Sequence, residues 1–180
     1  ISATQHLETN QSRINPYLVS IDRVQFDQTS GEIQVDFNTE NDVSLRGGFS
    51  HPVVRQLVTR ALLEAENPAV RLHAVKAVQH AMSASSEASP EMLLALTEVL
   101  QSEPSQAIRM QAVRALGMYP RPIDHRDALI RSLLTDSVTA IRMEAFEALR
   151  TLDDDADILD LLQATAEADS IDFFKHSLNQ

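Results

Sequence analysis

The chain has 180 residues and a formal net charge of −11, because 26 acidic residues outnumber 15 basic ones. This balance argues against nucleic-acid binding, which needs Lys and Arg gathered on one face, and it disfavours contact with an anionic membrane surface for the same reason. The chain contains no Cys, which excludes a thiol nucleophile, a disulfide and a Cys-ligated zinc.

The N-terminal part is predicted to be a linker followed by a small β-cap. Residues 1–15 are polar and carry only isolated apolar residues, which is typical of a linker. Over residues 16–49 apolar residues alternate as in three antiparallel strands, with a phase slip at Asp22 and Arg23 that predicts a bulge. Three strands cannot bury an apolar face alone, so we expect this cap to pack against the segment that follows.

From residue 50 to residue 180 the apolar spacing is helical. Ser50 and Asn67 lie at predicted helix starts, and each is followed within two residues by a Pro in the first turn. The pattern predicts four helical hairpins, and the last is the least faithful copy. Their helices are predicted at 50–66 with 67–82, 89–102 with 104–119, 124–134 with 137–152, and 155–168 with 170–178.

Three of the hairpins repeat almost the same ten residues in their second helix. The copies read "AVRLHAVKAV" from residue 69, "AIRMQAVRAL" from residue 107 and "AIRMEAFEAL" from residue 140. The third residue of each copy is Arg71, Arg109 or Arg142, at intervals of 38 and 33 residues, which is the period of a two-helix solenoid unit. The small and apolar residues that all copies retain are predicted to pack against neighbouring helices.

The repeated Arg is interpreted as part of the scaffold. Each one follows an acidic residue at the hairpin turn, and a guanidinium offers five donors, enough to bond both that carboxylate and the turn carbonyls. We expect these groups to form a structural ladder along the turns. The ladder consists of Glu66, Arg71, Glu103, Arg109, Asp136 and Arg142.

Two positions inside the repeated motif vary between copies, and they lie three residues apart on the side predicted to be exposed. The second helices of a solenoid often line one binding surface, so these positions form a candidate partner face. Its charge would change from basic in the first repeat to acidic in the third. We call this set the second-helix face: His73, Lys76, His80, Gln111, Arg114, Glu144 and Glu147.

These helix pairs, with Arg and Ala fixed after each turn, resemble the HEAT-repeat family over about residues 51–180. The resemblance implies a mainly α fold: an α-solenoid of about four HEAT-like helix pairs with a small N-terminal antiparallel β-piece. It implies a non-catalytic protein-interaction module whose partner is another protein. The fourth copy departs from the pattern, because Asp172 stands in place of the repeated Arg.

A closer resemblance is to the HEAT-repeat domain at the C-terminal side of bacterial anti-sigma-factor-like membrane proteins. It rests on "VQFDQTSGEIQVDFNTENDVSLRGGFSHPVVRQLVTRAL" followed by "ENPAVRLHAVKAV". The resemblance implies a periplasmic or extracytoplasmic sensing module, anchored by an upstream segment, with no direct membrane contact of its own. The zinc finger and membrane helix of that family are not in this sequence, and a cytoplasmic scaffold is the alternative.

The sequence offers little material for catalysis. His73 and His80 are seven residues apart and would share a helical face, but no third metal ligand accompanies them. The acidic run at 153–155, with Asp157 and Asp160, lacks the Gly and the Glu that a calcium loop needs, and a helix start explains it better. We therefore expect no metal or cofactor and no enzyme activity; a HEAT-like accessory enzyme of the chromophore lyase type is the alternative.

Overall fold

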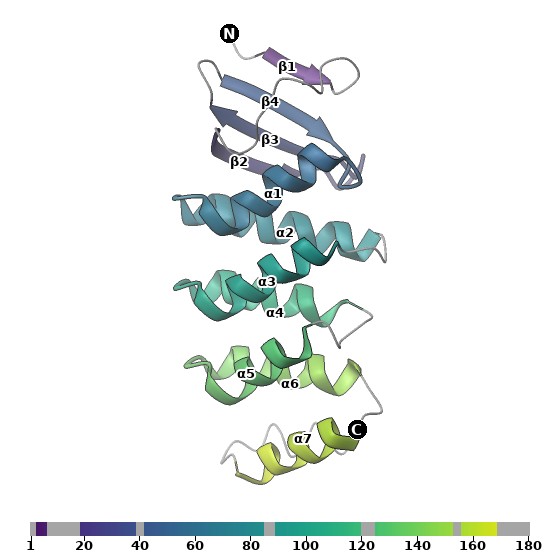
Figure 1. The fold of residues 1–180 in the computed structure, drawn as a ribbon, viewed down its shortest axis with the longest axis vertical. Helices are drawn as coiled ribbons and strands as arrows, with labels where there is room; N and C mark the ends of the chain where they lie inside the picture. The colour runs from purple at the N-terminus through teal and green to yellow at the C-terminus, as the bar shows by residue number, and fades with distance from the viewer. Residues whose placement is uncertain are drawn as a thin grey trace. The chain divides into compact units, whose positions relative to one another are not determined.

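The computed structural model describes residues 3–6, 19–38, 42–84, 89–119, 125–152 and 156–168. This part of the chain contains four strands and seven helices, which form two compact units, residues 1–85 and residues 86–180 (Figure 1). The predicted boundary between cap and helices, at residues 49 and 50, lies inside the first unit. The sheet and the first helix pair are therefore parts of one compact body.

The first unit contains a four-stranded sheet in the order β1–β4–β3–β2. Its strands are β1 (Ala3–His6), β2 (Ser20–Phe26), β3 (Ile33–Asn38) and β4 (Asp42–Gly47). Strands β2, β3 and β4 are antiparallel, as predicted, and the register of β2 shifts between Ile21 and Arg23, which confirms the bulge. Strand β1 runs parallel to β4. The prediction that residues 1–15 form a linker is therefore wrong for the four residues of this strand. A strand can add to an open sheet edge through its main chain, so a polar sequence does not reveal it.

The apolar face of the sheet packs on the first helix pair, α1 (Pro52–Glu64) and α2 (Pro68–Ala84). Val24, Val35 and Leu45 are paired across neighbouring strands and are buried there. Strand β2 lies along α2, while α1 contacts β2, β3 and β4. The cap thus buries its apolar face against the first repeat, as the sequence predicted.

The two helices of this pair begin at side-chain caps. Asn67 Oδ1 accepts a hydrogen bond from the Ala69 backbone N–H at 2.9 Å, which confirms the predicted cap of α2. The cap of α1 is His51, whose Nδ1 accepts from the Val53 N–H at 3.3 Å, and Ser50 lies one residue before it. In both helices a Pro takes the first position, where a missing N–H costs no hydrogen bond.

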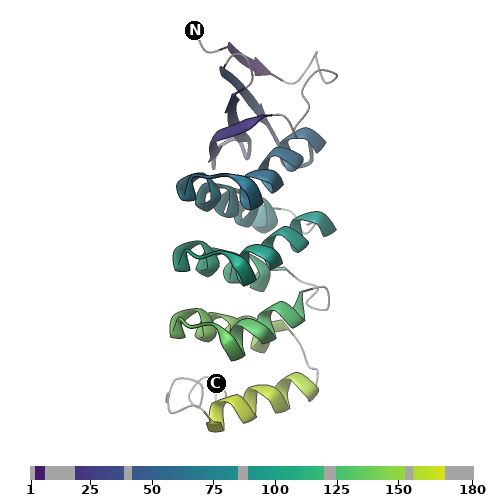
Figure 2. The same ribbon diagram turned by 60° about the vertical axis from the view of Figure 1, so that its left-hand side comes forward.

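The second unit is entirely helical in its described part: α3 (Pro90–Ser102), α4 (Gln106–Gly117), α5 (Arg126–Thr135), α6 (Thr139–Leu152) and α7 (Ala156–Ala168). Helices α3 and α4 form one hairpin and α5 and α6 the next, and the second helices α4 and α6 pack directly on each other (Figure 2). The retained motif residues Ala112, Val113, Ala145 and Phe146 are fully buried. The predicted packing role of the repeated apolar residues is therefore confirmed in this unit.

The stacked helix pairs confirm the predicted fold class, a mainly helical α-solenoid with a small N-terminal sheet. Helix α7 is the first helix of the predicted fourth pair, and the segment 170–178 predicted to complete it lies outside the described residues. Among the described helices none has both the length and the apolar character needed to cross a bilayer.

Candidate interaction surface and the turn ladder

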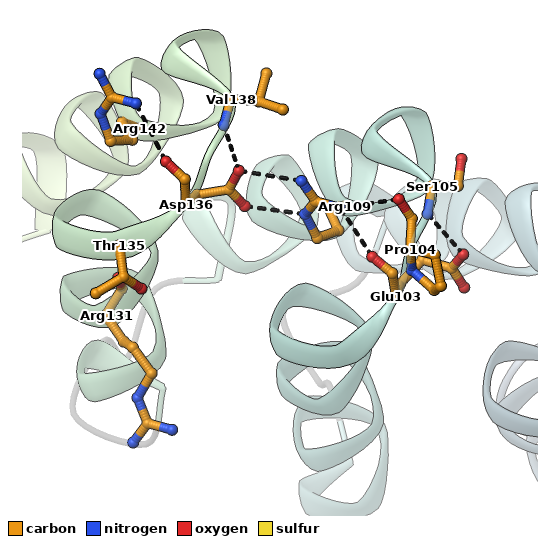
Figure 3. Close-up of polar contacts among 9 residues, drawn as sticks. All are labelled: Glu103, Pro104, Ser105, Arg109, Arg131, Thr135, Asp136, Val138 and Arg142. Atoms are coloured by element: carbon orange, nitrogen blue, oxygen red, sulfur yellow. Dashed lines mark hydrogen bonds and ion pairs between the residues drawn. The ribbon is translucent and has the colours of Figure 1, made fainter.

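Each repeated Arg reaches back to the main chain of the turn before its own helix. The guanidinium donates to the carbonyl oxygen of the residue six positions earlier, where the first helix ends and its last carbonyls lack helical partners. Figure 3 shows these bonds for Arg109 and Arg142. The bonds run from Arg71 to Ala65 O at 2.7 Å and Glu66 O at 3.1 Å, from Arg109 to Glu103 O at 2.9 Å and Pro104 O at 3.1 Å, and from Arg142 to Asp136 O at 3.1 Å. The Arg side chain therefore closes the hairpin turn.

The acidic side chains of the second unit bond differently from the prediction. Asp136 Oδ1 accepts from the Val138 N–H at 2.8 Å, and Glu103 Oε1 accepts from the Ser105 N–H at 3.0 Å, so each acid supports the start of the next helix. The sequence suggested that the carboxylate of Asp136 would bind Arg142 of its own turn. Instead Arg142 donates to the backbone carbonyl of Asp136, while the carboxylate accepts from the Val138 N–H and from Arg109.

The carboxylate of Asp136 binds Arg109 of the preceding repeat. Nε of Arg109 lies 2.9 Å from Oδ2 and Nη2 lies 3.1 Å from Oδ1, a bidentate ion pair with side chains only 12 % and 7 % exposed. Burial by itself raises the pKa of Asp136, but the hydrogen bonds from Arg109 and Val138 and the charges of Arg109 and Arg142 outweigh it and hold the pKa below its usual range. The hydrogen bond to Asp136 likewise raises the pKa of Arg109. This pair joins successive turns.

The second-helix face in the second unit carries ion pairs within and between repeats. Arg114 of α4 binds Glu144 of α6, with Nε 3.2 Å from Oε2, and both side chains are partly exposed at 44 % and 35 %. Glu147 is paired with Arg150 one turn along α6 at 2.8 Å. Gln111 lies three residues before Arg114 on α4 and is half-buried. The structure thus brings four varied positions onto the neighbouring helices α4 and α6, where charges of both signs alternate.

In the first unit the sheet takes up part of the predicted face. The ring of His80 stacks on Phe26 of β2 with centroids 4.8 Å apart and planes 3° from parallel, and His80 is half-buried. His73 is exposed and lines a cleft of about 500 Å³ with the hairpin that joins β2 to β3. Lys76 is exposed. The strands lie far from α2 in the sequence, so the helical repeat alone could not show this contact.

The metal sites considered from the sequence do not assemble in the described part of the chain. No group of three or more His, Cys, Asp or Glu side chains gathers there in an arrangement that could hold a metal ion. His80 packs on Phe26, and the acidic run at 153–155 lies outside the described residues.

A second cleft, of about 400 Å³, lies in the second unit at the turn side of α3, α4 and α5. We call it the turn cleft. It is lined by Leu100, Gln101, Glu103, Arg109, Arg131, Ser132, Thr135, Asp136 and Ser137. Arg131 Nη1 donates to Gln101 Oε1 at 3.0 Å and so joins α5 to α3. The repeated motif lies in the second helices and therefore gave no signal for Arg131 or Ser132, which lie on a first helix.

The comparisons with known proteins agree with the repeat pattern. The family model described as HEAT repeats matches residues 43–117 and 93–178, which together span most of the chain. No curated protein and no solved structure is significantly similar to the chain. The matched segments contain all three copies of the motif and the turns that its Arg residues close. The chain belongs to the HEAT-repeat family.

Proposed function

We propose that this chain is a non-catalytic module that binds another protein. The observation that carries the proposal is that the retained and the varied positions of the repeated motif differ in burial. Most residues retained in every copy are buried in the helix stack, and the Arg is bonded to a turn, whereas the positions that change lie at the partly or fully exposed surface. The first Ala of each copy, at 69, 107 and 140, is retained although it is exposed. A scaffold that keeps its packing and varies its surface is typical of repeat proteins that bind macromolecules.

The surface proposed to bind is the part of the second-helix face on α4 and α6. Arg114 and Glu144 present partly exposed charges of opposite sign on adjacent helices, and Glu147 adds a further charge one turn along. Exposed charged positions of this kind set partner specificity and association rate more than affinity. His73 and Lys76 of α2 remain candidates for the first unit, and His80 contributes less because it stacks on Phe26.

A charge exchange tests this surface. The double variant Arg114→Glu with Glu144→Arg keeps the ion pair and reverses its direction, so the fold should persist while the surface pattern changes. As a matched control, Arg60→Glu with Glu64→Arg exchanges an ion pair within α1. Proteins recovered with the tagged chain from its own cells are quantified by mass spectrometry. We expect a specific partner to be lost only with the first exchange; equal recovery of every enriched protein would refute the surface.

We further propose that the module is the extracytoplasmic part of an anti-sigma-factor-like regulator. The support is the resemblance of residues 24–78 to the corresponding segment of that class of membrane protein, a segment that here contains β3, β4, α1 and most of α2. Fusing alkaline phosphatase to the C-terminus of the full gene product tests the location. Activity is expected, because that enzyme matures only outside the cytoplasm; a fusion that is expressed but inactive would contradict it.

A further inference from the structure

The two edges of the sheet in the first unit differ in what lies beside them. Strand β2 forms one edge, and α2 lies along it, so that Val24 in the middle of the strand is fully buried. The bulge between Ile21 and Arg23 and the exposed charge of Asp22 also oppose the addition of a strand there. Strand β1 forms the other edge, beside β4 (Figure 1). In the described part of the chain neither a helix nor a bulge blocks this second edge.

Strand β1 is joined to the rest of the sheet differently from the other strands. Strands β2, β3 and β4 follow one another in the chain and pack on α1 and α2. Strand β1 precedes them and makes its extensive contacts with β4 alone, while the chain continues from His6 to Ser20 at the opposite edge. Its sequence, ATQH, contains Ala and Gln, which favour strands less than β-branched residues do. Strand β1 can therefore leave β4 while the other three strands keep their order.

A row of buried apolar residues crosses the sheet and meets a polar residue in β1. Val24, Val35 and Leu45 are in register on β2, β3 and β4, and each is at most 1 % exposed. The residue of β1 in register with Leu45 is Gln5. Residues in register on neighbouring strands lie on the same face of a sheet, so the apolar row ends at a polar position.

A second row ends at a small residue. Phe37 of β3 is in register with Val43 of β4, and the next position, on β1, is Ala3. Phe37 is buried, whereas Val43 is only half-buried. The apolar face is thus incompletely covered at the side of β4 that β1 occupies. Larger apolar residues at the two positions of β1 would extend both rows.

We propose that the edge of β4 is the docking site for an extended segment of the partner protein, which takes the place of β1. The segment adds to the sheet through main-chain hydrogen bonds. It carries β-branched apolar residues at the two positions in register with Val43 and Leu45, and polar residues next to them. In the free protein β1 closes this edge. The inference rests on the proposed interaction role but uses a surface distinct from that of α4 and α6.

Titration of the ¹⁵N-labelled full chain with the peptide acetyl-Ser-Val-Thr-Val-Thr-Ser-amide tests the proposal. We expect saturable shifts of the backbone amide signals of β4, with a dissociation constant on the order of millimolar. The analogue with Gln in place of both Val residues should bind about fivefold more weakly, because two apolar cross-strand pairs are lost. Equal binding of the two peptides, or saturable shifts confined to other elements, overturns the proposal.

Variants of β1 show whether the peptide takes its place. The double variant Thr4→Pro with Gln5→Pro should bind the Val peptide about fivefold more tightly, because fewer molecules hold the edge closed. Adjacent N–H groups of a strand point to opposite edges, so one of the two Pro residues removes a donor from the pairing with β4. Gln5→Val should bind about threefold more weakly, since Val pairs better with Leu45 and holds β1 in place. Ser137→Pro is the control and should leave binding unaltered, because it lies in the other unit, where Pro104 stands at the same place of the preceding turn.

The direction of these changes separates displacement of β1 from other modes of binding. A double variant that binds more weakly than wild type would show that the peptide adds outside β1, and equal affinity of all variants would show that β1 does not compete; either result overturns the proposal. Dimerisation of the double variant, measured by light scattering at the titration concentrations, would assign the edge to a second copy and overturn it as well. Gln5→Val keeps every N–H and serves as the test if the double variant loses its helical circular dichroism. The readouts need no cellular partner, so they are independent of the charge-exchange experiment on α4 and α6.

Discussion

At the scale of single residues, Asp136 carries two structural contacts with one carboxylate. It accepts from the Val138 N–H at the start of α6 and from Nε and Nη2 of Arg109 in the preceding repeat. The Arg109 side chain also holds the carbonyls of Glu103 and Pro104, so one guanidinium connects two successive turns. In this unit the repeated Arg residues are therefore not independent of one another, because Arg109 and Asp136 link one turn to the next.

Replacing Asp136 by Asn should lower the free energy of unfolding by about 2 to 4 kcal/mol at neutral pH, because Arg109 loses its charged partner in a largely buried site. Chemical denaturation followed by circular dichroism measures the change. Asp160→Asn, which removes an exposed carboxylate from α7, is the control and should stay within about 0.5 kcal/mol of wild type. A similar small effect at both positions would argue against the ion pair as a stabilising contact.

The same pair predicts a dependence of stability on pH. The folded protein holds the pKa of Asp136 below its ordinary value, so the unfolded chain takes up the proton first as the pH falls. The stabilisation is complete above the unfolded pKa of about 3.9 and is lost as the pH falls through the lower, folded pKa. The difference between wild type and Asp136→Asn should therefore narrow below about pH 4, and a constant difference down to about pH 2 would contradict the assignment.

At the scale of secondary-structure elements, the close approach of α4 and α6 depends on Gly117. A Cβ placed on this glycine would lie 2.8 Å from the Cβ of Ala148, well inside contact distance. Both atoms belong to rigid parts of the side chains, so the clash cannot be relieved by rotating a flexible group. The repeated small residues of the motif allow the second helices to stack, and Gly117 extends this to the end of α4.

Gly117→Ala should lower the free energy of unfolding by about 1 to 2 kcal/mol, because the overpacking exceeds the gain of up to about 1 kcal/mol in helix propensity. Adding Ala148→Gly should recover part of the loss by restoring the space. Gly48→Ala is a matched control, since its new Cβ would meet only Ser50 Oγ at 3.7 Å, an ordinary contact. Thermal denaturation of the wild type and the three variants checks the order, and a stabilised Gly117→Ala protein would refute the close approach.

At the scale of the whole molecule, each of the two compact units has its own core. The second unit buries Leu96, Ile108, Leu116, Leu129 and Phe146 among its own helices. In the first unit the helix pair shares its core with the sheet. The helix pair of the first unit therefore depends on the sheet for its stability, whereas the helix pairs of the second unit stabilise one another.

A fragment of residues 86–180 should fold alone, with helical circular dichroism and a cooperative thermal transition, because its helices bury their apolar faces on one another. Residues 50–85 without the sheet should be mostly unfolded, since a single hairpin of this size cannot bury enough surface. Equal helicity of the two fragments per residue would contradict the shared core of the first unit.

Much of the fold follows directly from the sequence. The spacing of Arg71, Arg109 and Arg142 and the Pro residues at the starts of α1 and α2 indicated the hairpins, because helix caps and apolar period are local properties of the chain. Strand β1 could not be predicted in this way, because it pairs with β4 through main-chain contacts between residues about forty positions apart. The candidate site was predicted only in part: the varied positions on α4 and α6 were found, and the stacking of Phe26 on His80 was not.

The sequence by itself determined the repeat unit, its helices and the retained residues that pack them. Only the tertiary structure decided which acid each Arg binds, that His80 meets the sheet, and that Arg131 and Ser132 line one cleft with the Arg109–Asp136 pair. The reason is physical. Helical period and capping depend on neighbours within a few positions, whereas ion pairs and clefts depend on side chains that stacking brings together from different repeats.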